Sequence, residues 1–450
     1  MARQVDFYGT SFYPKHSTSV DRDLPWRGAL LDFARSFGYA DGRNGFYVGE
    51  LQAGFGTIAL NVSPAVTPAD LRIWTWSALA RGAKGINYYA WYPMSSGYES
   101  GGFGMIQLDG TVTERAREAG SIARVVDANQ RLFLEARPPR AEVAIVYNPL
   151  MHFVGGRQRA ASYGGPQGEA AGIERDSLLG VYRALFPLNV PIDYVHIEDV
   201  AAGALKPYKL VVLPYPPMLP ERSAAALAEY VKQGGALVAE ARLGWNNERG
   251  FAAGRIPGMG LADAMGCRET GVQTGARGST ALVWSDASIP GIAAGLRVPA
   301  RWYEETLEPL GTQARVAAHF PDGSAAAVVS TYGKGKTLML GSYVSAAYES
   351  APSRETERFY ASLLDWAGVT RPVTAEGGKI EVRTLERGDE RLVFVFNHDT
   401  KEVAANVALR LPAGAYTAKD LATGAAVPFA GGRLSRTLAP AEVWVVRLAK

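Results

Sequence analysis

Two glutamates in the first hundred residues stand where catalytic carboxylates are expected. Glu50 ends the apolar run "GFYVGEL" and is followed at once by "QAGFG", which is rich in glycine. Glu99 lies in "WYPMSSGYES", a loop rich in tyrosine and tryptophan. Two carboxylates at one pocket can cleave a glycosidic bond, because one attacks the anomeric carbon and the other protonates the leaving oxygen. The plainer interpretation of Glu50 is a solvated residue that ends a strand.

Aromatic and amide side chains accompany both glutamates. Sugars need such groups, because their C–H faces pack on rings while their hydroxyls form hydrogen bonds. Tyr89 and Trp91 could equally belong to the core of a buried strand, and His16 could be an ordinary surface histidine. The candidate substrate-binding residues are Tyr13, His16, Gln52, Tyr89 and Trp91.

These groups follow the strands of an alternating strand and helix pattern, which predicts parallel strands joined by right-handed crossovers. In a barrel of such strands the carboxyl ends meet at one mouth, where functional residues gather. A closed eight-stranded barrel takes roughly 250 residues, so the segment 1–137 is predicted to be a partial or small (β/α) TIM-like barrel. The strands are expected over 5–14, 45–51 and 85–92, and the helices over 24–38, 67–83 (amphipathic, with Trp74 and Trp76 as packing groups) and 112–136.

Two further domains are predicted. Apolar runs without alternation over 141–371 indicate a doubly wound α/β sheet whose strands are buried on both faces. Short alternating runs separated by turn signals over 372–450 indicate a small antiparallel β-sandwich. In the middle domain, "GKGKT" lacks the spacing of a phosphate-binding loop and is expected to be a hairpin turn. Glu240 has no nucleophile elbow beside it, and Cys267 is interpreted as structural.

The order "GELQAG", then "PADLRIWTWSALARGAKGINYYAWYPMSSGYESGGFGMIQLDG", resembles the end of the catalytic barrel in glycoside hydrolase family 42, the β-galactosidases. The resemblance implies that Glu50 takes the place of the nucleophile, and that Glu99 takes the place of a sugar-binding glutamate. It places Tyr89 and Trp91 at the aromatic positions of the eighth strand. It also implies an α/β oligomerisation domain, similar to glutamine amidotransferases, followed by a small β-sandwich.

One departure from the family concerns the acid/base. In the family this glutamate follows an asparagine at the end of the fourth strand, whereas this chain begins near the sixth. Its one comparable "NE", in "NNERG" at 246–250, falls in the second α/β region. Three explanations stay open: a partner chain or second copy completes the barrel, Glu99 serves as the acid/base, or the chain no longer catalyses.

Composition limits the other partners. The hydrophobic share of 47%, the charged share of 20% and the net charge of +3 favour neither nucleic acid nor a membrane as partner. Five scattered histidines and one cysteine give no metal-ligand spacing and no internal disulfide, so no metal or cofactor is expected. The N-terminus resembles no signal peptide, and a cytoplasmic location is predicted. A partial barrel has apolar edges that need covering, which predicts a homo-oligomer.

The leading hypothesis is a glycoside hydrolase acting on a small β-glycoside. It would cleave terminal β-D-galactosides or β-D-glucosides by retaining double displacement, with Glu50 as nucleophile. The alternative is a non-catalytic carbohydrate-binding or assembly protein derived from a glycosidase.

Overall fold

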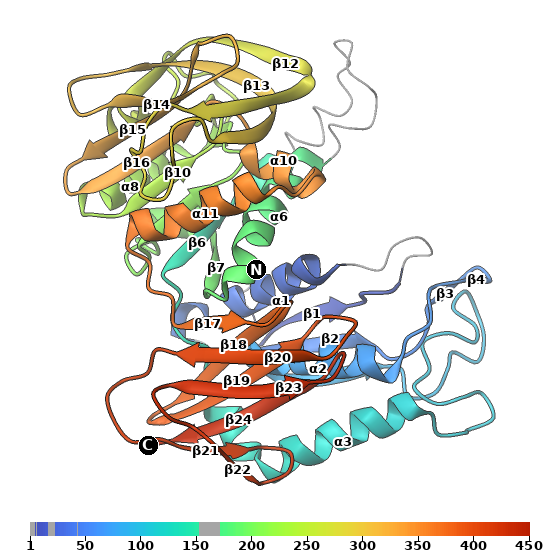
Figure 1. Ribbon diagram of the computed structural model, residues 1–450. Coiled ribbons are helices and arrows are strands. Elements are labelled where there is room, and N and C mark those ends of the chain that lie inside the picture. Colours follow the sequence, from blue (N-terminus) through green and yellow to red (C-terminus); the bar gives the residue numbers. More distant parts are fainter. Residues whose placement is uncertain (1–4, 6, 17–22, 43, 153–171) are drawn as a thin grey trace. The chain divides into compact units, whose positions relative to one another are not determined.

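The chain forms two compact units in a computed structural model that describes residues 5, 7–16, 23–42, 44–152 and 172–450. Unit 1 comprises 1–140, 187–189 and 371–450, and unit 2 comprises 141–186 and 190–370. The two ends of the sequence therefore belong to one unit. Because the first and third predicted domains share this unit, the division into three domains stays a prediction. Figure 1 shows the elements of both units.

Unit 1 opens with three parallel strands in the order β1-β2-β5. The strand β2 lies between the other two, so β1 and β5 are the edges of this sheet. A short hairpin, β3–β4, follows β2. The bounds are β1 (Tyr8–Phe12), β2 (Phe46–Gln52), β3 (Thr57–Ile58), β4 (Asn61–Val62) and β5 (Ala83–Tyr89).

Helices connect these strands as the sequence pattern predicts. The helix α2 begins with a capping box, in which Thr67 accepts from the Asp70 amide and Asp70 accepts from the Thr67 amide. The predicted single helix over 112–136 is interrupted at Asn129, so two helices form there. The bounds are α1 (Leu24–Gly38), α2 (Pro68–Ala80), α3 (Glu114–Ala128) and α4 (Gln130–Glu135).

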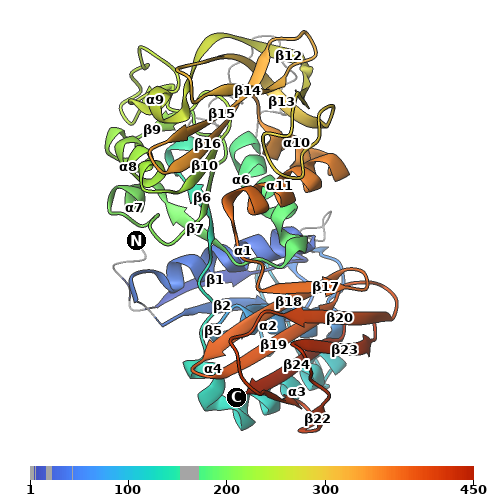
Figure 2. The ribbon, with the colours of Figure 1, turned by 60° about the vertical axis from the view of Figure 1, so that its left-hand side comes forward.

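The helix α2 is buried on all sides, which corrects the prediction that it is amphipathic. Trp74 is fully buried and Trp76 nearly so. The cause is a second layer: α2 contacts strands β18, β19 and β24 of the C-terminal sandwich (Figure 2). The Trp76 ring lies 6.1 Å from the Phe394 ring of β19 and 6.2 Å from the Phe133 ring of α4. A helix that is apolar all round needs such cover.

Two antiparallel sheets make up the sandwich, in the orders β17-β20-β23 and β18-β19-β24-β21-β22. The strand β19 serves two cores. Its Val393 and Val395 face the core between the two sheets, while Leu392, Phe394 and Phe396 join the core of the first segment. The bounds are β17 (Val373–Glu376), β18 (Ile380–Arg387), β19 (Glu390–Asn397), β20 (Val403–Leu409), β21 (Thr417–Asp420), β22 (Ala426–Val427), β23 (Arg433–Leu438) and β24 (Val443–Ala449).

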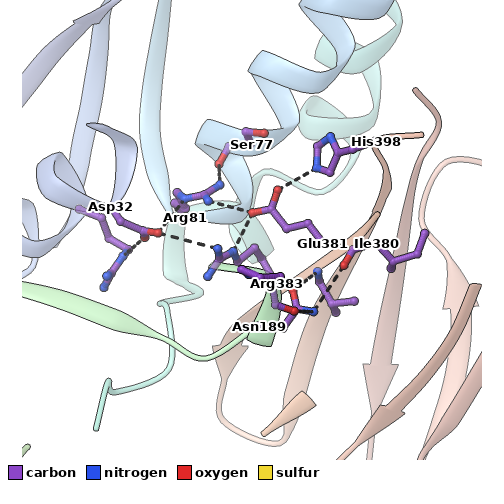
Figure 3. Close-up of polar contacts among 11 residues, drawn as sticks. Asp32, Ser77, Arg81, Asn189, Ile380, Glu381, Arg383 and His398 are labelled. Atoms are coloured by element: carbon purple, nitrogen blue, oxygen red, sulfur yellow. Dashed lines mark hydrogen bonds and ion pairs between the residues drawn. The ribbon is translucent and has the colours of Figure 1, made fainter. Parts of the chain in front are cut away.

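A buried ionic network crosses this junction (Figure 3). Arg81, which follows α2, contacts the Asp32 carboxylate of α1 at 3.2 Å and the Glu381 carboxylate of β18 at 2.8 Å. Arg383 and His398 also contact Glu381, at 2.8 and 2.9 Å. Burial alone would raise the pKa of Glu381, but the two guanidinium groups and His398 hold it well below its usual value.

Asn189 connects a third segment, residues 187–189, to the strand β18 that carries Glu381. Its side-chain oxygen accepts from the Val382 amide at 2.8 Å, and its side-chain nitrogen donates to the Ile380 carbonyl at 3.4 Å. Residues 187–189 therefore belong to unit 1 although they interrupt the sequence of unit 2.

Unit 2 contains a nine-stranded sheet with a parallel half and an antiparallel half. Counted in chain order, the five parallel strands β6, β7, β8, β10 and β16 are arranged 2-1-3-4-5, an order typical of doubly wound sheets. Sequence reasoning did not anticipate the antiparallel strands β12 to β15 that extend this sheet. The "GKGKT" segment is a hairpin between β15 and β16, as predicted.

The strands of the nine-stranded sheet are β6 (Val143–Tyr147), β7 (Ile192–His196), β8 (Leu210–Leu213), β10 (Ala236–Ala239), β12 (Cys267–Trp284), β13 (Arg297–Pro309), β14 (Arg315–His319), β15 (Ala325–Tyr332) and β16 (Gly335–Leu340). The short strands β9 (Met218–Leu219) and β11 (Asn246–Asn247) pair with each other. The helices are α6 (Ile173–Leu185), α7 (Ile197–Ala201), α8 (Glu221–Lys232), α9 (Leu261–Met265), α10 (Val344–Ser350) and α11 (Arg354–Ala367).

Among the described residues of unit 2, the carboxyl groups of Glu240 and Glu305 are wholly buried. Burial raises the pKa of Glu240 to about 7, although the amide and hydroxyl of Ser345 donate to its two oxygens. Burial likewise raises the pKa of Glu305, which accepts from the Arg242 amide at 2.7 Å. Cys267 is buried too, and burial raises the pKa of its thiol, consistent with a structural role.

Replacing Arg81 with methionine should lower the free energy of unfolding of unit 1 by about 3–5 kcal/mol, because Asp32 and Glu381 are then left buried without this partner. Denaturant unfolding followed by tryptophan fluorescence measures the change. Arg117→Met removes an exposed ion pair with Glu114 and should barely move the transition. Equal effects of the two substitutions would contradict the assigned role of the network.

The stability of unit 2 should fall as pH rises from about 4.5 to about 7. In this window the unfolded chain releases the Glu240 proton while the folded chain keeps it. The loss is of the order of 3 kcal/mol, since each pKa unit corresponds to about 1.4 kcal/mol. Thermal unfolding across this range checks the slope. Glu240→Gln should reduce the slope, and the buried Glu305, whose pKa is also raised, should account for what remains. Glu308→Gln, at an exposed ion pair, should leave the slope unchanged.

Candidate active site

The carboxyl ends of the three parallel strands of unit 1 bring together most of the predicted site residues. Ser11 of β1 lies beside Glu50 of β2 in the strand register, and Gln52 lies beside Tyr89 of β5. Tyr13 follows β1 directly. Because the strands are parallel, these side chains share one edge of the sheet.

Two hydroxyl groups hold Glu50. Ser11 Oγ and Tyr13 OH both donate to Glu50 Oε2, each at 3.0 Å. Among the described residues no donor contacts Oε1. Burial raises the pKa of Tyr13, and its hydrogen bond to the Glu50 carboxylate raises it further, so Tyr13 stays a protonated donor. One carboxylate oxygen is therefore fixed while the other stays available.

A second tyrosine holds Glu99. Tyr89 OH donates to Glu99 Oε2 at 2.9 Å, and this hydrogen bond is the main reason that the pKa of Tyr89 is raised. The Tyr89 and Tyr13 rings lie 6.1 Å apart, edge to face. Both carboxylates raise the pKa of both tyrosines electrostatically. The two tyrosines thus connect Glu50 and Glu99 within one polar cluster.

An aromatic wall surrounds the tyrosines. The Phe103 ring lies 5.8 Å from that of Tyr13, 5.3 Å from that of Tyr89 and 5.5 Å from that of His16. His16 Nδ1 is buried and has no hydrogen-bond partner among the described residues. His16 is therefore packed into the site wall and is not an ordinary surface histidine.

Gln52 has a positioning role in this structure. It is fully buried, its side-chain oxygen accepts from the Lys15 amide at 2.9 Å, and its nitrogen donates to the Gly54 carbonyl at 3.0 Å. The Lys15 ammonium in turn pairs with Asp70 of α2 at 2.8 Å. Since both polar ends of Gln52 bind backbone, it joins the loops after β1 and β2, and the prediction that it contacts substrate gains no support.

Trp91 is largely exposed, with 59% of its surface open to solvent. Tyr98 is similarly exposed, at 67%. Neither ring packs against another aromatic ring among the described residues, so the prediction that Trp91 is a sugar platform stays open.

The glycines after Glu50 allow two loops to approach each other closely. A Cβ on Gly54 would lie 2.4 Å from the Gly104 carbonyl oxygen, and one on Gly56 would lie 2.8 Å from His16 Nδ1. The Phe103 amide donates to the Phe55 carbonyl at 2.7 Å. The loop after β2 therefore packs on the loop that carries Glu99 and Phe103.

Sequence reasoning missed Ser11 and Phe103. A signal for Ser11 was present, because residues two apart on a strand share a face and Tyr13 was already a candidate. Phe103 gave no such signal, since it lies in an irregular loop and its contacts come from three separate segments.

No group of three or more histidine, cysteine, aspartate or glutamate side chains in the described part of the chain is arranged to hold a metal ion. The helices described are also too short or too polar to cross a membrane.

Two family models match the chain. The model described as beta-galactosidase covers residues 1–128, and the model described as beta-galactosidase trimerisation domain covers residues 141–370. The chain belongs to glycoside hydrolase family 42, the β-galactosidases.

Individual beta-galactosidases are similar to the chain. The chain is 26% identical over 343 residues to beta-galactosidase LacZ of Heyndrickxia coagulans, a match covering 74% of this chain and 46% of that protein. It is 27% identical over 424 residues to a Thermus thermophilus beta-galactosidase, covering 90% of this chain and 57% of that protein. The chain thus spans about half the length of these relatives.

A solved structure shares the fold. The beta-galactosidase from Bacillus circulans sp. alkalophilus superposes with a TM-score of 0.81 at 21% identity, over 100% of this chain and 61% of that one. The predicted resemblance to family 42 is confirmed, and the mixed α/β fold of the chain is that of the family.

Gly54→Ala should destabilise unit 1 by about 1–3 kcal/mol, because the added Cβ collides with the Gly104 carbonyl and forces the two loops apart. Chemical denaturation measures the loss. Gly85→Ala in the neighbouring strand β5 is the control, since its Cβ meets only the Tyr47 side chain at 3.7 Å. If Gly54→Ala were as mild as the control, the loops would not be packed as described.

Proposed function

We propose that this family 42 chain contributes the nucleophile and the sugar-binding wall of a retaining glycoside hydrolase acting on terminal β-D-galactosides. The observation that carries the proposal is Glu50, which lies near the carboxyl end of the central strand β2 and is bound through one oxygen by two hydroxyl donors. Homology to β-galactosidases favours galactose as the sugar. Cleavage of β-D-glucosides is a secondary expectation.

In the proposed reaction, Oε1 of Glu50 attacks the anomeric carbon. The bond from that carbon to the leaving oxygen breaks, and the leaving oxygen takes a proton from an acid. Water then attacks the glycosyl ester, gives up its proton to the same group acting as base, and releases the sugar and the Glu50 carboxylate. Ser11 and Tyr13 orient the carboxylate and keep Oε2 engaged, so that a single oxygen faces the sugar.

Glu99 has two proposed roles. It could be the acid/base, because the tyrosines connect it to Glu50 and a retaining pair needs carboxyl groups about 5–5.5 Å apart. It could instead bind a sugar hydroxyl, as its place in the family pattern implies. Tyr89 and His16 would then form the rest of the sugar-binding wall.

The assembly is also a proposal. The family name of residues 141–370 refers to trimerisation, which supports a homo-oligomer built through unit 2. The sheet β1-β2-β5 holds three strands of what we propose is an eight-stranded barrel, so a further segment would be needed to close it. A cytoplasmic location and the absence of any cofactor stay predictions.

Glu50→Gln should abolish covalent labelling of the chain by 2,4-dinitrophenyl 2-deoxy-2-fluoro-β-galactoside. This leaving group needs no protonation, so the test does not depend on the acid/base. Mass spectrometry should find one sugar on the peptide containing Glu50 in the unchanged chain and none in the variant. Glu114→Gln, at an exposed carboxylate, is the control. Labelling that persists in Glu50→Gln would overturn the proposal.

Glu99→Gln separates the two roles of Glu99. An acid/base role predicts that hydrolysis slows roughly 10²–10⁴-fold for poor leaving groups but that azide restores turnover of the dinitrophenyl galactoside. A sugar-binding role predicts a raised KM for every substrate and no response to azide.

The second candidate function is non-catalytic sugar binding. It is favoured by the hydroxyl and aromatic groups of Tyr13 and Tyr89, which would bind a sugar whether or not its glycosidic bond is cleaved. Saturable binding of galactose by calorimetry, without any labelling of Glu50, would select it.

A further inference from the structure

The first turn of α3 binds the two loops that lie next to the proposed catalytic carboxylates. Arg115 Nε donates to the Ala53 carbonyl at 3.1 Å, and Arg115 Nη2 donates to the Gly104 carbonyl at 2.9 Å. Ala53 follows β2, the strand that carries Glu50, and Gly104 belongs to the loop that carries Glu99. One guanidinium group therefore joins the end of β2 to the loop after β5.

Other contacts at the same place hold the loops at short range. A Cβ on Gly54 would lie 2.4 Å from the Gly104 carbonyl oxygen, so the two backbones already touch beside the guanidinium. Thr113, which caps α3 by accepting from the Ala116 amide, also donates from its hydroxyl to the Met105 carbonyl. Donors from one helix end thus reach carbonyls of both loops, which fixes the loops relative to each other.

The Arg115 guanidinium has no competing acidic partner. In the described part of the chain no carboxylate pairs with this half-buried group, and burial lowers the pKa of Arg115. Taking a cation out of water without an opposite charge costs free energy, which the two carbonyls partly offset. Arginine presents its N–H donors in a rigid planar fork, so one side chain can bridge two carbonyl oxygens at fixed directions.

We infer that Arg115 is a positioning residue, which sets the place of the Glu99 loop relative to Glu50 without touching the sugar. The inference rests on the proposed function, because Oε1 of Glu50 must meet the anomeric carbon of a sugar whose other contacts come from the Glu99 loop. A displacement of about 1 Å can slow a reaction roughly 10²-fold. Without the guanidinium, contacts such as that between the Phe103 amide and the Phe55 carbonyl would hold the loops alone.

Arg115→Ala in the full chain tests this role through labelling by the dinitrophenyl fluorogalactoside. The maximal rate constant for labelling Glu50 should fall on the order of 10²-fold, because the carboxylate and the sugar are misaligned. The reagent concentration that gives half of this rate should stay nearly the same, since the sugar keeps its contacts. Methylguanidinium at millimolar concentration should restore part of the lost rate by occupying the vacated place.

Arg117→Ala is the matched control on the same helix. Arg117 is an exposed arginine that pairs with Glu114, so its removal should change neither the labelling rate nor the response to methylguanidinium. Arg115→Lys keeps the charge and replaces Arg115→Ala if that variant does not fold. It should label about tenfold more slowly than the unchanged chain, because one ammonium cannot bridge both carbonyls as the fork does.

Hydrogen exchange measures the same contacts without catalysis. The Phe103 amide donates to the Phe55 carbonyl at 2.7 Å, so exchange over residues 98–105 should quicken in Arg115→Ala and slow again with methylguanidinium. If the unchanged chain is not labelled at Glu50, the proposed function fails, and the exchange still decides whether Arg115 holds the loops.

Three outcomes would overturn the inference. The first is labelling of Arg115→Ala or Arg115→Lys at the rate of the unchanged chain. The second is exchange over residues 98–105 that neither variant alters. The third is a smaller labelled fraction at an unchanged rate constant, without any effect of methylguanidinium, which would make Arg115 a residue that only stabilises the fold.

Discussion

The buried guanidinium of Arg81 is the constraint on which unit 1 depends. It contacts carboxylates from α1 and from β18, segments about 350 residues apart in the sequence, and all three side chains are almost fully excluded from water. A buried charge is tolerated only where partners surround it, so the sandwich and the first segment must come together. Arg81 also lies between α2 and β5. The position of β5, and with it Tyr89, is tied to that junction.

The arrangement of the polar side chains in the site follows from the parallel strands and from the close packing of the loops after them. β1, β2 and β5 end at one edge, which places Ser11 and Tyr13 beside Glu50 and places Tyr89 where the Glu99 loop can reach it. Each carboxylate then has at least one hydroxyl donor, a preorganised arrangement that orients without neutralising the charge. Glycine at position 54 lets the loops pack closely enough for this to occur.

In unit 2 the carboxylate at a strand end is buried and bound by neighbouring protein groups. Glu240 lies at the carboxyl end of a parallel strand, where a doubly wound sheet usually binds ligands. Here Tyr215, Tyr343 and Ala241 form a packed apolar cluster at that end, and Ser345 satisfies the carboxylate. This end of the strand is therefore part of the packed core of unit 2.

The sequence by itself determined the local elements and the candidate residues. Neighbouring residues set the cap at Thr67, the alternation of strands and helices, and the position of Glu50 near a strand end. The resemblance to family 42 was also visible in the sequence alone. Only the tertiary structure decided that α2 is covered on its outer face, that Gln52 binds backbone, that Ser11 shares Glu50 with Tyr13, and that antiparallel strands extend the sheet of unit 2. The reason is physical. Helix and strand propensities depend on adjacent residues, whereas burial and hydrogen-bond partners depend on residues that meet only after the chain has folded.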